Sequence, residues 1–541
     1  MKLSLKDLNS SQRIELIVGT FLIVGLALVP LAVSFPYRIN IFLSWEGAYR
    51  LYLGQIPFRD FTIPLGYAYW LIPALFFKLF GPHLYTLVIA QVFINIVSGL
   101  AFWSILRTLR VQSVIIVSSL LVFCVSFSFF NFWPWYNHTV IVYQFVALSF
   151  ILRYIFTDHR LRWLYLLGGC FFLLVSFFTK QDAGGLGFAI CLVLMLYVSW
   201  VDRSPKHILL FLGFYLFFAA CVVLPLLSYN FSYWFNYGQP PHFSRIAATD
   251  FLNDIFGDSR WEKFYLLIIG VLLLSRVKSI TALINDQREM VFLLLTLGIL
   301  VEALLFQVTS YVPPDNNIFF HSFAFAYIFS NLNLSFSYTR PWQAISLGVL
   351  VMLWWSGSYW RYVERIVGRL VPSSIEENEV QRISKSSWNQ GLEAQNKPNV
   401  GDWVYSSLPV FDRVYMPKET VEGIDRLMKM PVVTQKKEAL DMLNMSELTP
   451  LAHEIGYKLP TGPNQPLWYH FGVSMFQPQV DQYCANIETQ QYDVVLFEYI
   501  PYLNNFYPFQ IQDCLKEYYQ VVDSFPAPRS DGFSTIEVYT R

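Results

Sequence analysis

The chain has 541 residues, of which 55% are hydrophobic, 18% aromatic and only 14% charged, which excludes an ordinary soluble protein. The formal net charge of zero hides an uneven distribution. Residues 361–541 hold 16 Lys+Arg and 23 Asp+Glu, which leaves 22 and 15 for residues 1–360. A first part of about +7 and a tail of about −7 predict a membrane domain joined to a soluble, acidic domain and give no sign of nucleic-acid binding.

Eleven segments of the first part are apolar and near the length of about 20 residues that a membrane-spanning helix needs. They lie near residues 14–35, 86–106, 112–130, 139–157, 163–179, 184–201, 207–228, 263–275, 289–309, 317–334 and 342–360. The stretch 64–80 is also apolar, but Pro64, Pro73 and Lys78 interrupt it. We therefore expect an interfacial or re-entrant helix there rather than a twelfth span.

The basic residues between these segments predict the orientation of the chain in the membrane. With eleven spans, Arg107 and Arg110 lie in a cytoplasmic loop, the N-terminus is cytoplasmic and the tail is extracytoplasmic. We expect a multi-pass membrane protein. Most of the other polar clusters then gather on the outer side, which is typical of a cavity that opens to the exterior. These clusters lie at residues 36–63, 131–138, 179–185, 229–262 and 310–321.

The first external loop follows the first apolar segment and is rich in both charged and aromatic residues. It carries the carboxylates Glu46 and Asp60 among the cations Arg38, Arg50 and Arg59. A carboxylate at a membrane surface can act as a general base when its surroundings adjust its pKa. The same spacing also suits two ion pairs, Glu46 with Arg50 four residues on and Asp60 with Arg59. Both interpretations stay open.

The run TKQDAGG (179–185) joins two apolar segments and holds Lys180, Gln181 and Asp182 before two glycines. A lysine beside exposed backbone N–H groups at a helix start can hold a phosphate. The alternative is a lysine that extends to the membrane surface from a solvated turn.

Three further external residues are candidates for contacts with a substrate. His321, within NIFFHSFAFAY, can donate to a phosphate oxygen or can be an ordinary hydrogen-bonded residue at the membrane interface. His242 and Arg245, in the 229–262 loop, are candidates for an acceptor site, although a solvated loop explains each of them alone.

The tail is predicted as a juxtamembrane helix and linker over 361–390 and an α/β domain over 391–541, after a membrane domain over 1–360. KETVEGIDRLMKM (418–430) and KKEALDMLNM (436–445) read as helices, and 492–500 and 534–541 read as strands. Cys484 and Cys514 of the tail can form a disulfide if the tail is exported, but two cysteines alone leave their pairing open.

The first external loop resembles that of the GT-C membrane glycosyltransferases, in the bacterial branch similar to aminoarabinose transferases and protein O-mannosyltransferases. The resemblance rests on the run Gly54–Phe61 (GQIPFRDF) with Pro64, on Leu79–Gly81, and on the TKQDAGG and IFFHS stretches. Trp45–Glu46 stands where those enzymes carry an Asp-Glu pair, so the first aspartate is missing.

The resemblance implies an enzyme of the glycosyltransferase class with a mainly α, polytopic membrane domain of about eleven transmembrane helices and a small α/β extracytoplasmic C-terminal domain. It would be an inverting transferase that moves a sugar from a polyprenyl-phosphate donor to a glycan, lipid or protein acceptor. Glu46 or Asp60 is then the base, and Arg59, Lys180 and His321 hold the lipid phosphate. A divalent cation, Mg²⁺ or Mn²⁺, is an open expectation, with Glu46, Asp60 and Asp182 as its ligands.

Other functions fit parts of the pattern. A transporter or flippase of lipid-linked glycans needs a polar path through the membrane, whereas the polar residues here gather on one side. An oligosaccharide polymerase or ligase shares the donor but relies on large external loops rich in Arg and His. An anchored assembly protein would not need eleven spans.

Overall fold

The structure is a computed structural model. It describes residues 9–37, 41–235, 259–276, 280–310, 319–332, 341–354, 402–467, 469, 475–501, 507–528 and 533–541.

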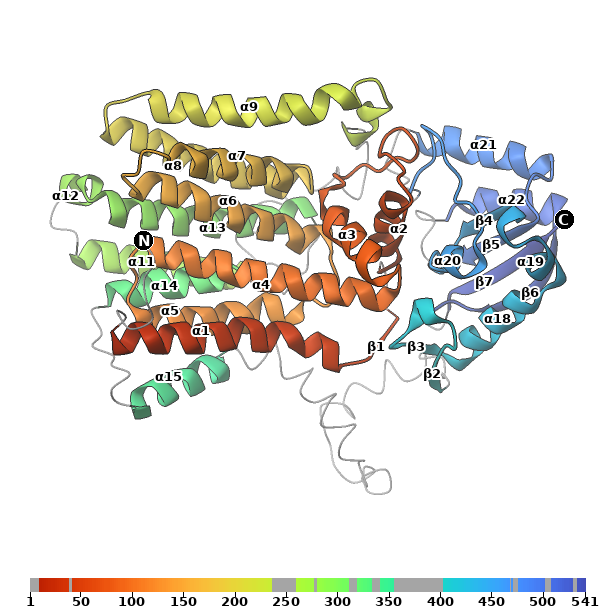
Figure 1. The fold of residues 1–541 in the computed structure, drawn as a ribbon, viewed down its shortest axis with the longest axis horizontal. Helices are drawn as coiled ribbons and strands as arrows, with labels where there is room; N and C mark the ends of the chain where they lie inside the picture. Colours follow the sequence, from red (N-terminus) through yellow and green to blue (C-terminus); the bar gives the residue numbers. More distant parts are fainter. Residues whose placement is uncertain are drawn as a thin grey trace.

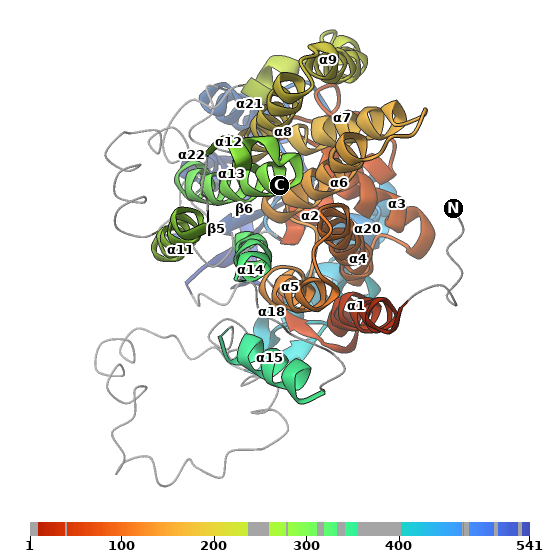
Figure 2. The same cartoon turned by 90° about the vertical axis from the view of Figure 1, so that its left-hand side faces the viewer.

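Most of the first 354 residues form a bundle of long helices that lie roughly side by side (Figures 1 and 2). Its helices are α1 (Ser10–Leu28), α4 (Leu84–Thr108), α5 (Ser113–Ser126), α6 (Tyr136–Phe156), α7 (Trp163–Phe177), α8 (Gln181–Val201), α9 (Lys206–Leu226), α11 (Arg260–Arg276), α12 (Ile280–Asn285), α13 (Gln287–Ser310), α14 (Phe320–Asn331) and α15 (Pro341–Trp354). Apolar side chains such as Phe102, Phe145 and Phe323 form the core of the bundle, while Leu216 and Leu274 are exposed on its outside. A packed core with apolar side chains exposed on the outside is typical of a helix bundle that lies in a lipid bilayer.

Among the residues that the structure describes, six helices are long and apolar enough to cross a membrane, by length and composition. They are α1 with its short extension to Ala32, α4, α6, α8, α9 and the first part of α13. Helices α5 and α7 are apolar but shorter, so the count of eleven spans stays a prediction. The stretch predicted as interfacial contains a short turn over Ala68–Trp70 and the ten-residue helix α3 (Leu71–Phe80).

Helices α2 (Ile41–Tyr52) and α3 lie at one end of the bundle, between the long helices and the C-terminal part of the chain (Figure 1). The two short helices cross closely because Gly47 has no side chain: a Cβ atom there would lie 1.9 Å from the Trp70 ring. Trp45 and Trp70 are buried in a hydrophobic cluster that continues into Phe411 and Leu448 of the C-terminal part. The α2–α3 region and the C-terminal part therefore share one core.

Residues 402–541 fold around a four-stranded sheet of order β4-β5-β7-β6. Strand β4 runs parallel to β5, and the other neighbours are antiparallel. The strands are β4 (Met442–Met445), β5 (Val494–Tyr499), β6 (Gln520–Pro526) and β7 (Thr535–Thr540), and the helices are α18 (Lys418–Lys429), α19 (Pro431–Lys436), α20 (Leu451–Ile455), α21 (Phe476–Glu488) and α22 (Phe509–Tyr518). The predicted boundaries at residues 361 and 391 lie outside the described residues.

The predicted helix 418–430 and the two predicted strands are confirmed by α18, β5 and β7. The predicted helix 436–445 is wrong. Lys437 has a positive φ of 45°, which ends α19, and Met442–Met445 pairs with Val494–Phe497 as a buried strand. Sheet pairing and burial outweigh the helical preference of this methionine- and leucine-rich segment.

A second, smaller sheet connects the two ends of the sequence. Strand β1 (Phe35–Pro36), directly after the first long helix, pairs in parallel with β3 (Val414–Pro417), and β3 pairs with β2 (Trp403–Tyr405). The Tyr37 hydroxyl also donates a hydrogen bond to the carbonyl of Glu447. These contacts hold the C-terminal part against the end of the bundle from which α2 departs.

Cys484 of α21 and Cys514 of α22 form a disulfide, which answers the question that the sequence left open. The bridge closes a loop of 30 residues, and the loss of loop entropy predicts a stabilisation of about 3–4 kcal/mol. We expect the double variant Cys484→Ser/Cys514→Ser to lower the unfolding temperature of the C-terminal part in the full-length protein, measured calorimetrically in lipid nanodiscs. Cys221→Ser, at an exposed unpaired cysteine, is the matched control and should leave that transition unchanged.

Candidate functional site

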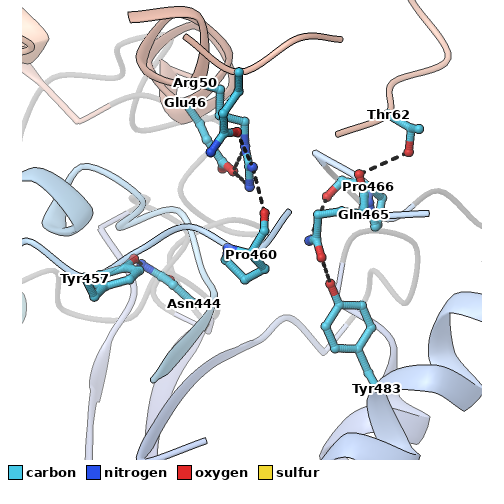
Figure 3. A network of polar contacts seen from close by, with 10 residues as sticks. Glu46, Arg50, Thr62, Asn444, Tyr457, Pro460, Gln465, Pro466 and Tyr483 are labelled. Atoms are coloured by element: carbon cyan, nitrogen blue, oxygen red, sulfur yellow. Dashed lines mark hydrogen bonds and ion pairs between the residues drawn. The ribbon is translucent and has the colours of Figure 1, made fainter. Parts of the chain in front are cut away.

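The side chains of Glu46 and Arg50 form a buried ion pair on α2. Arg50 donates from Nε to Glu46 Oε1 at 2.9 Å, and its Nη2 lies 2.8 Å from the same oxygen. Both side chains are less than a tenth exposed. Arg50 Nη1 also donates to Gln55 Oε1 at 3.0 Å and to the carbonyl oxygen of Pro460 at 2.9 Å (Figure 3). The guanidinium thus joins α2 to a loop of the C-terminal part.

The two oxygens of the Glu46 carboxylate have different surroundings. Oε1 receives both contacts from Arg50, while Oε2 has no hydrogen-bond partner among the described residues. Burial raises the pKa of Glu46, and the charge of Arg50 opposes that shift. A carboxylate with a raised pKa and one oxygen left over is suited to accept a proton.

Glu46 and Arg50 line a cavity of about 40 Å³ between α2 and the C-terminal part. The opposite wall contains the end of β4, the residues after it, residues from the segment 457–467, Tyr469 and Tyr507. Its polar members are Asn444, Ser446, Thr449, Tyr457, Gln465, Tyr469 and Tyr507. Burial raises the pKa of Tyr457, and the Glu46 charge adds to the shift, so the two groups are close enough to interact electrostatically.

Asp60 is held in a different way. Its two oxygens accept hydrogen bonds from Arg59 Nε at 2.8 Å and Nη2 at 2.7 Å, and Oδ2 also accepts from the backbone N–H of Ile56 at 2.7 Å. The Arg59 hydrogen bonds lower the pKa of Asp60, as does the Ile56 bond, although partial burial opposes them. The carboxylate therefore stabilises the turn at 56–60. Both ion pairs that the sequence spacing suggested, Glu46 with Arg50 and Asp60 with Arg59, are present. Of the two carboxylates, only Glu46 keeps an oxygen without a hydrogen-bond partner among the described residues.

The loop after Asp60 is fastened to the same segment of the C-terminal part. The Thr62 N–H donates to the carbonyl of Gln465 at 2.7 Å, and the Leu467 N–H donates to the carbonyl of Thr62 at 2.9 Å. The N–H of Gly462 donates to the carbonyl of Asp60 at 2.8 Å. Gln465 in turn accepts from the Tyr483 hydroxyl at 2.6 Å (Figure 3). Residues of α2 and residues about 400 positions later in the sequence therefore lie on opposite sides of one cavity.

Lys180 lies at the start of α8 and is buried, so the alternative of a lysine extending from a solvated turn is wrong. Its Nζ is 3.2 Å from Asp182 Oδ2, 4.5 Å from the centre of the Phe306 ring and 5.6 Å from that of Tyr136. Burial lowers the pKa of Lys180, and Asp182 opposes the shift. Gln181 Nε2 donates to the carbonyl of Trp234 at 2.9 Å.

The glycines after Lys180 have a packing role. A Cβ atom at Gly184 would lie 2.4 Å from the backbone of Phe177, and one at Gly187 would lie 2.7 Å from Gln144. These two glycines thus let α8 approach α7 and α6 closely.

Aromatic side chains separate Lys180 from Glu46. Tyr136 lies against Tyr69, whose ring centre is 5.9 Å away, and Tyr69 lies 4.6 Å from Trp70, the residue beneath Gly47. The described contacts therefore form two polar centres, one around Glu46 and one around Lys180, with an aromatic layer between them.

His321, among the other predicted residues, does not line the Glu46 cavity. His321 is buried, its Nδ1 shares a hydrogen bond of 2.8 Å with the Tyr265 hydroxyl, and its ring stacks on Phe320 at 4.1 Å. This matches the alternative of an ordinary hydrogen-bonded histidine. His242 and Arg245 lie outside the described residues.

The three predicted metal ligands do not come together. Glu46, Asp60 and Asp182 each pair with a cation, Arg50, Arg59 and Lys180 respectively. Within the described ranges no group of three or more His, Cys, Asp or Glu side chains could hold a metal ion. These residues do not fit a divalent cation as they are arranged.

Comparison with known proteins identifies the fold. No family model and no curated protein matches the sequence. The chain is similar to the crystal structure of ArnT from Cupriavidus metallidurans in the apo state, with 13% identity over 98% of both chains and a TM-score of 0.51. The structure of the same protein bound to undecaprenyl phosphate aligns at 12% identity over 98% of this chain and 97% of that one, with a TM-score of 0.45. The predicted resemblance to aminoarabinose transferases is confirmed at the level of the fold.

Proposed function

We propose that the protein is an inverting membrane glycosyltransferase, which moves a sugar from a polyprenyl-phosphate donor to an acceptor at the end of the bundle covered by the C-terminal part. The shared fold with ArnT supports a transferase of this kind. The observation that carries the proposal is Glu46 Oε2, an open carboxylate oxygen in a cavity between the bundle end and the C-terminal part.

In the proposed reaction, Glu46 Oε2 takes the proton of the acceptor hydroxyl as its oxygen forms a bond to the anomeric carbon of the donor sugar. The bond from that carbon to the lipid phosphate oxygen breaks on the opposite face, which inverts the configuration, and polyprenyl phosphate leaves. Arg50 holds Glu46 in place and stabilises its charged form. Because the predicted ligands do not fit a metal ion, the proposed steps use none.

We assign the base to Glu46 rather than Asp60 because their hydrogen bonds differ. Asp60 accepts three hydrogen bonds that favour its charged form, so it is a weak base at neutral pH. Glu46 has a raised pKa and an oxygen with no described partner. We expect the acid limb of the pH–rate profile to lie above the usual range of glutamate, and a limb at or below pH 4 would contradict this assignment.

Lys180 is the proposed partner of the lipid phosphate, with Gln181 and Asp182 fixing the start of α8 around it. Arg50 is less suited to that role, because four of its five N–H groups already have acceptors in Glu46, Gln55 and Pro460. The roles of Arg59, His321, His242 and Arg245 at the phosphate or acceptor remain part of the proposal.

We expect Lys180→Met to weaken binding of polyprenyl phosphate about 10- to 100-fold, since a hydrogen bond to a charged group contributes about 1.5–3 kcal/mol. The measurement is titration of the purified protein in nanodiscs with a short-chain polyprenyl phosphate. Lys78→Met removes a lysine that is exposed on α3 and serves as the matched control. Adding Asp182→Asn to Lys180→Met also removes the carboxylate charge that lies beside Lys180 in the wild type, so that misfolding is separated from loss of binding. Unchanged affinity in both Lys180 variants would contradict the assignment.

The experiment that tests the function most broadly compares the cell-envelope lipids and glycans of strains with and without the gene by mass spectrometry. A transferase predicts one glycan species that disappears together with accumulation of its lipid-linked sugar donor. Identical envelopes under all growth conditions would count against the proposal.

A further inference from the structure

Some polar groups on the wall of the cavity beside Glu46 are fully hydrogen-bonded within the chain, and others are not. Asn444 is saturated: its Nδ2 donates to the Leu448 carbonyl at 3.0 Å and to the Tyr457 hydroxyl oxygen at 3.1 Å, while Oδ1 accepts from Ser446. Ser446 Oγ both donates to Asn444 and accepts from the Leu448 N–H at 3.1 Å. These groups shape the wall and offer nothing to a ligand.

Three other groups on the same cavity keep unused hydrogen-bonding capacity. Thr449 Oγ1 is buried and has no hydrogen-bond partner in the described part of the chain. The Tyr457 hydroxyl accepts from Asn444, and its own proton has no acceptor among the described residues. Glu46 Oε2 is the third. Each of the three residues is more than nine-tenths buried.

A buried polar group without a hydrogen-bond partner lowers the stability of the folded protein. A buried donor or acceptor without a partner costs about 1–3 kcal/mol, and native proteins contain few of them. Thr449 is also replaceable by the isosteric Val, which would remove the cost entirely. Three such groups on one cavity therefore indicate a site whose polar partner comes from outside the chain.

The three groups select the chemistry of that partner. A carboxylate oxygen only accepts, a tyrosine proton is donated, and a threonine hydroxyl does either. An alcohol complements this set, because its O–H donates to Glu46 while its oxygen accepts from Tyr457 or Thr449. A phosphate would be repelled by the negative charge of the Glu46 carboxylate. Arg50 could donate only its one remaining N–H group to it. The cavity wall also includes apolar side chains, which suit the C–H faces of a sugar or polyol; among them are Leu443, Met445, Leu459 and Leu467.

The size of the cavity limits what enters it. One water molecule needs about 10–15 Å³ of cavity volume. The cavity of about 40 Å³ therefore holds about three water molecules, or one hydroxyl group with the carbon atom that bears it. The remainder of the acceptor lies outside the cavity.

We infer that this cavity binds a hydroxyl-bearing group of a carbohydrate or polyol, that Thr449 and Tyr457 are the residues of the C-terminal part that hold it, and that Glu46 Oε2 lies beside it. That the group belongs to the acceptor rests on the proposed glycosyl transfer. Binding of the group does not, because it follows from the cavity alone.

The test is saturation-transfer NMR on the full-length protein in nanodiscs, with methyl hexopyranosides and glycerol as hydroxylated probes and with inorganic phosphate as the anionic one. We expect a hydroxylated probe to bind the wild type and to lose at least about tenfold in affinity in Thr449→Val and in Tyr457→Phe. Thr449→Val should not lower the unfolding temperature, because the hydroxyl it removes has no partner.

Thr420→Val is the matched control. Thr420 is also a buried threonine of the C-terminal part, but its Oγ1 donates to the carbonyl of Pro526 at 2.8 Å. That variant should lose stability and keep probe binding, the opposite of Thr449→Val.

The outcomes separate the site from the function. Hydroxylated probes that bind Thr449→Val and Tyr457→Phe as tightly as the wild type, or bind none of the three proteins, would overturn the inference and leave glycosyl transfer standing. The same holds if only phosphate binds. Loss of probe binding in both variants, in a protein that transfers no sugar, would support the site and count against the proposed function.

Discussion

Replacing Glu46 with glutamine is expected to lower the rate of sugar transfer by about 10²- to 10⁴-fold, the range that general-base catalysis contributes. Glutamine keeps the shape of the side chain, and its Oε1 can still accept both contacts from Arg50. It has no basic oxygen to take the acceptor proton. The loss should be seen in kcat, measured from release of polyprenyl phosphate at saturating acceptor. The KM for the acceptor should also rise, because glutamine lacks the second oxygen that accepts a hydrogen bond from the acceptor hydroxyl.

The matched variant is Asp60→Asn, in the same loop. Asp60 pairs with an Arg59 that is about half exposed, and such pairs contribute about 0–1 kcal/mol, so we expect activity within a few-fold of the wild type and a small loss of stability. A large loss of kcat in Asp60→Asn with activity retained in Glu46→Gln would move the base to Asp60. Retained activity in both variants would rule out a carboxylate base in this loop.

The second large effect is expected at Gly66, where the loop before α3 crosses the end of α7. A Cβ atom there would lie 1.6 Å from the carbonyl oxygen of Phe178, and the neighbouring N–H of Ala68 donates to that same oxygen at 3.2 Å. The obstacle is backbone rather than a flexible side chain, so Gly66→Ala must push the α3 region away from the start of α8. We expect a loss of about 3 kcal/mol, the upper end for overpacking, together with loss of transfer.

The effect is measured as the unfolding temperature in nanodiscs and as protection of the α3 region from hydrogen exchange. Gly213→Ala is the control, since a Cβ atom at Gly213 of α9 meets nothing within 4 Å, and alanine there should leave stability unchanged or slightly raised. A fully stable and active Gly66→Ala would contradict the close crossing of these two segments.

The parts of the fold that depend on local pattern could be predicted from the sequence. The apolar segments, the interrupted stretch 64–80 and the alternating strand 534–541 follow from hydropathy and period. The segment 436–445 could not, because pairing of Met442–Met445 with β5 is a long-range effect. The pairing of β1 with β3, which joins residues near 35 and 415, could not be predicted either, because no local sequence pattern indicates it.

Some residues of the candidate site could likewise be predicted from the sequence, and others could not. Glu46 and Lys180 stand out because charges are rare in a chain this apolar, and both prove to be buried. Thr449 and Tyr457 have nothing unusual about them in the sequence, and only the folded chain brings them to the cavity of Glu46. The hydrogen bonds that distinguish Glu46 from Asp60 likewise depend on three-dimensional contacts with Arg50, Arg59 and the Ile56 backbone.

Glycosyl transfer itself is tested most directly with the purified full-length protein in nanodiscs, supplied with a panel of polyprenyl-phosphate sugars and a hydroxylated acceptor. The measurement is the release of polyprenyl phosphate together with the anomeric configuration of the product. We expect release coupled to a product of inverted configuration, in the wild type and in Asp60→Asn but not in Glu46→Gln. Intact donors that only cross the bilayer of a proteoliposome, at the same rate in the wild type and in Glu46→Gln, would contradict it and identify a transporter.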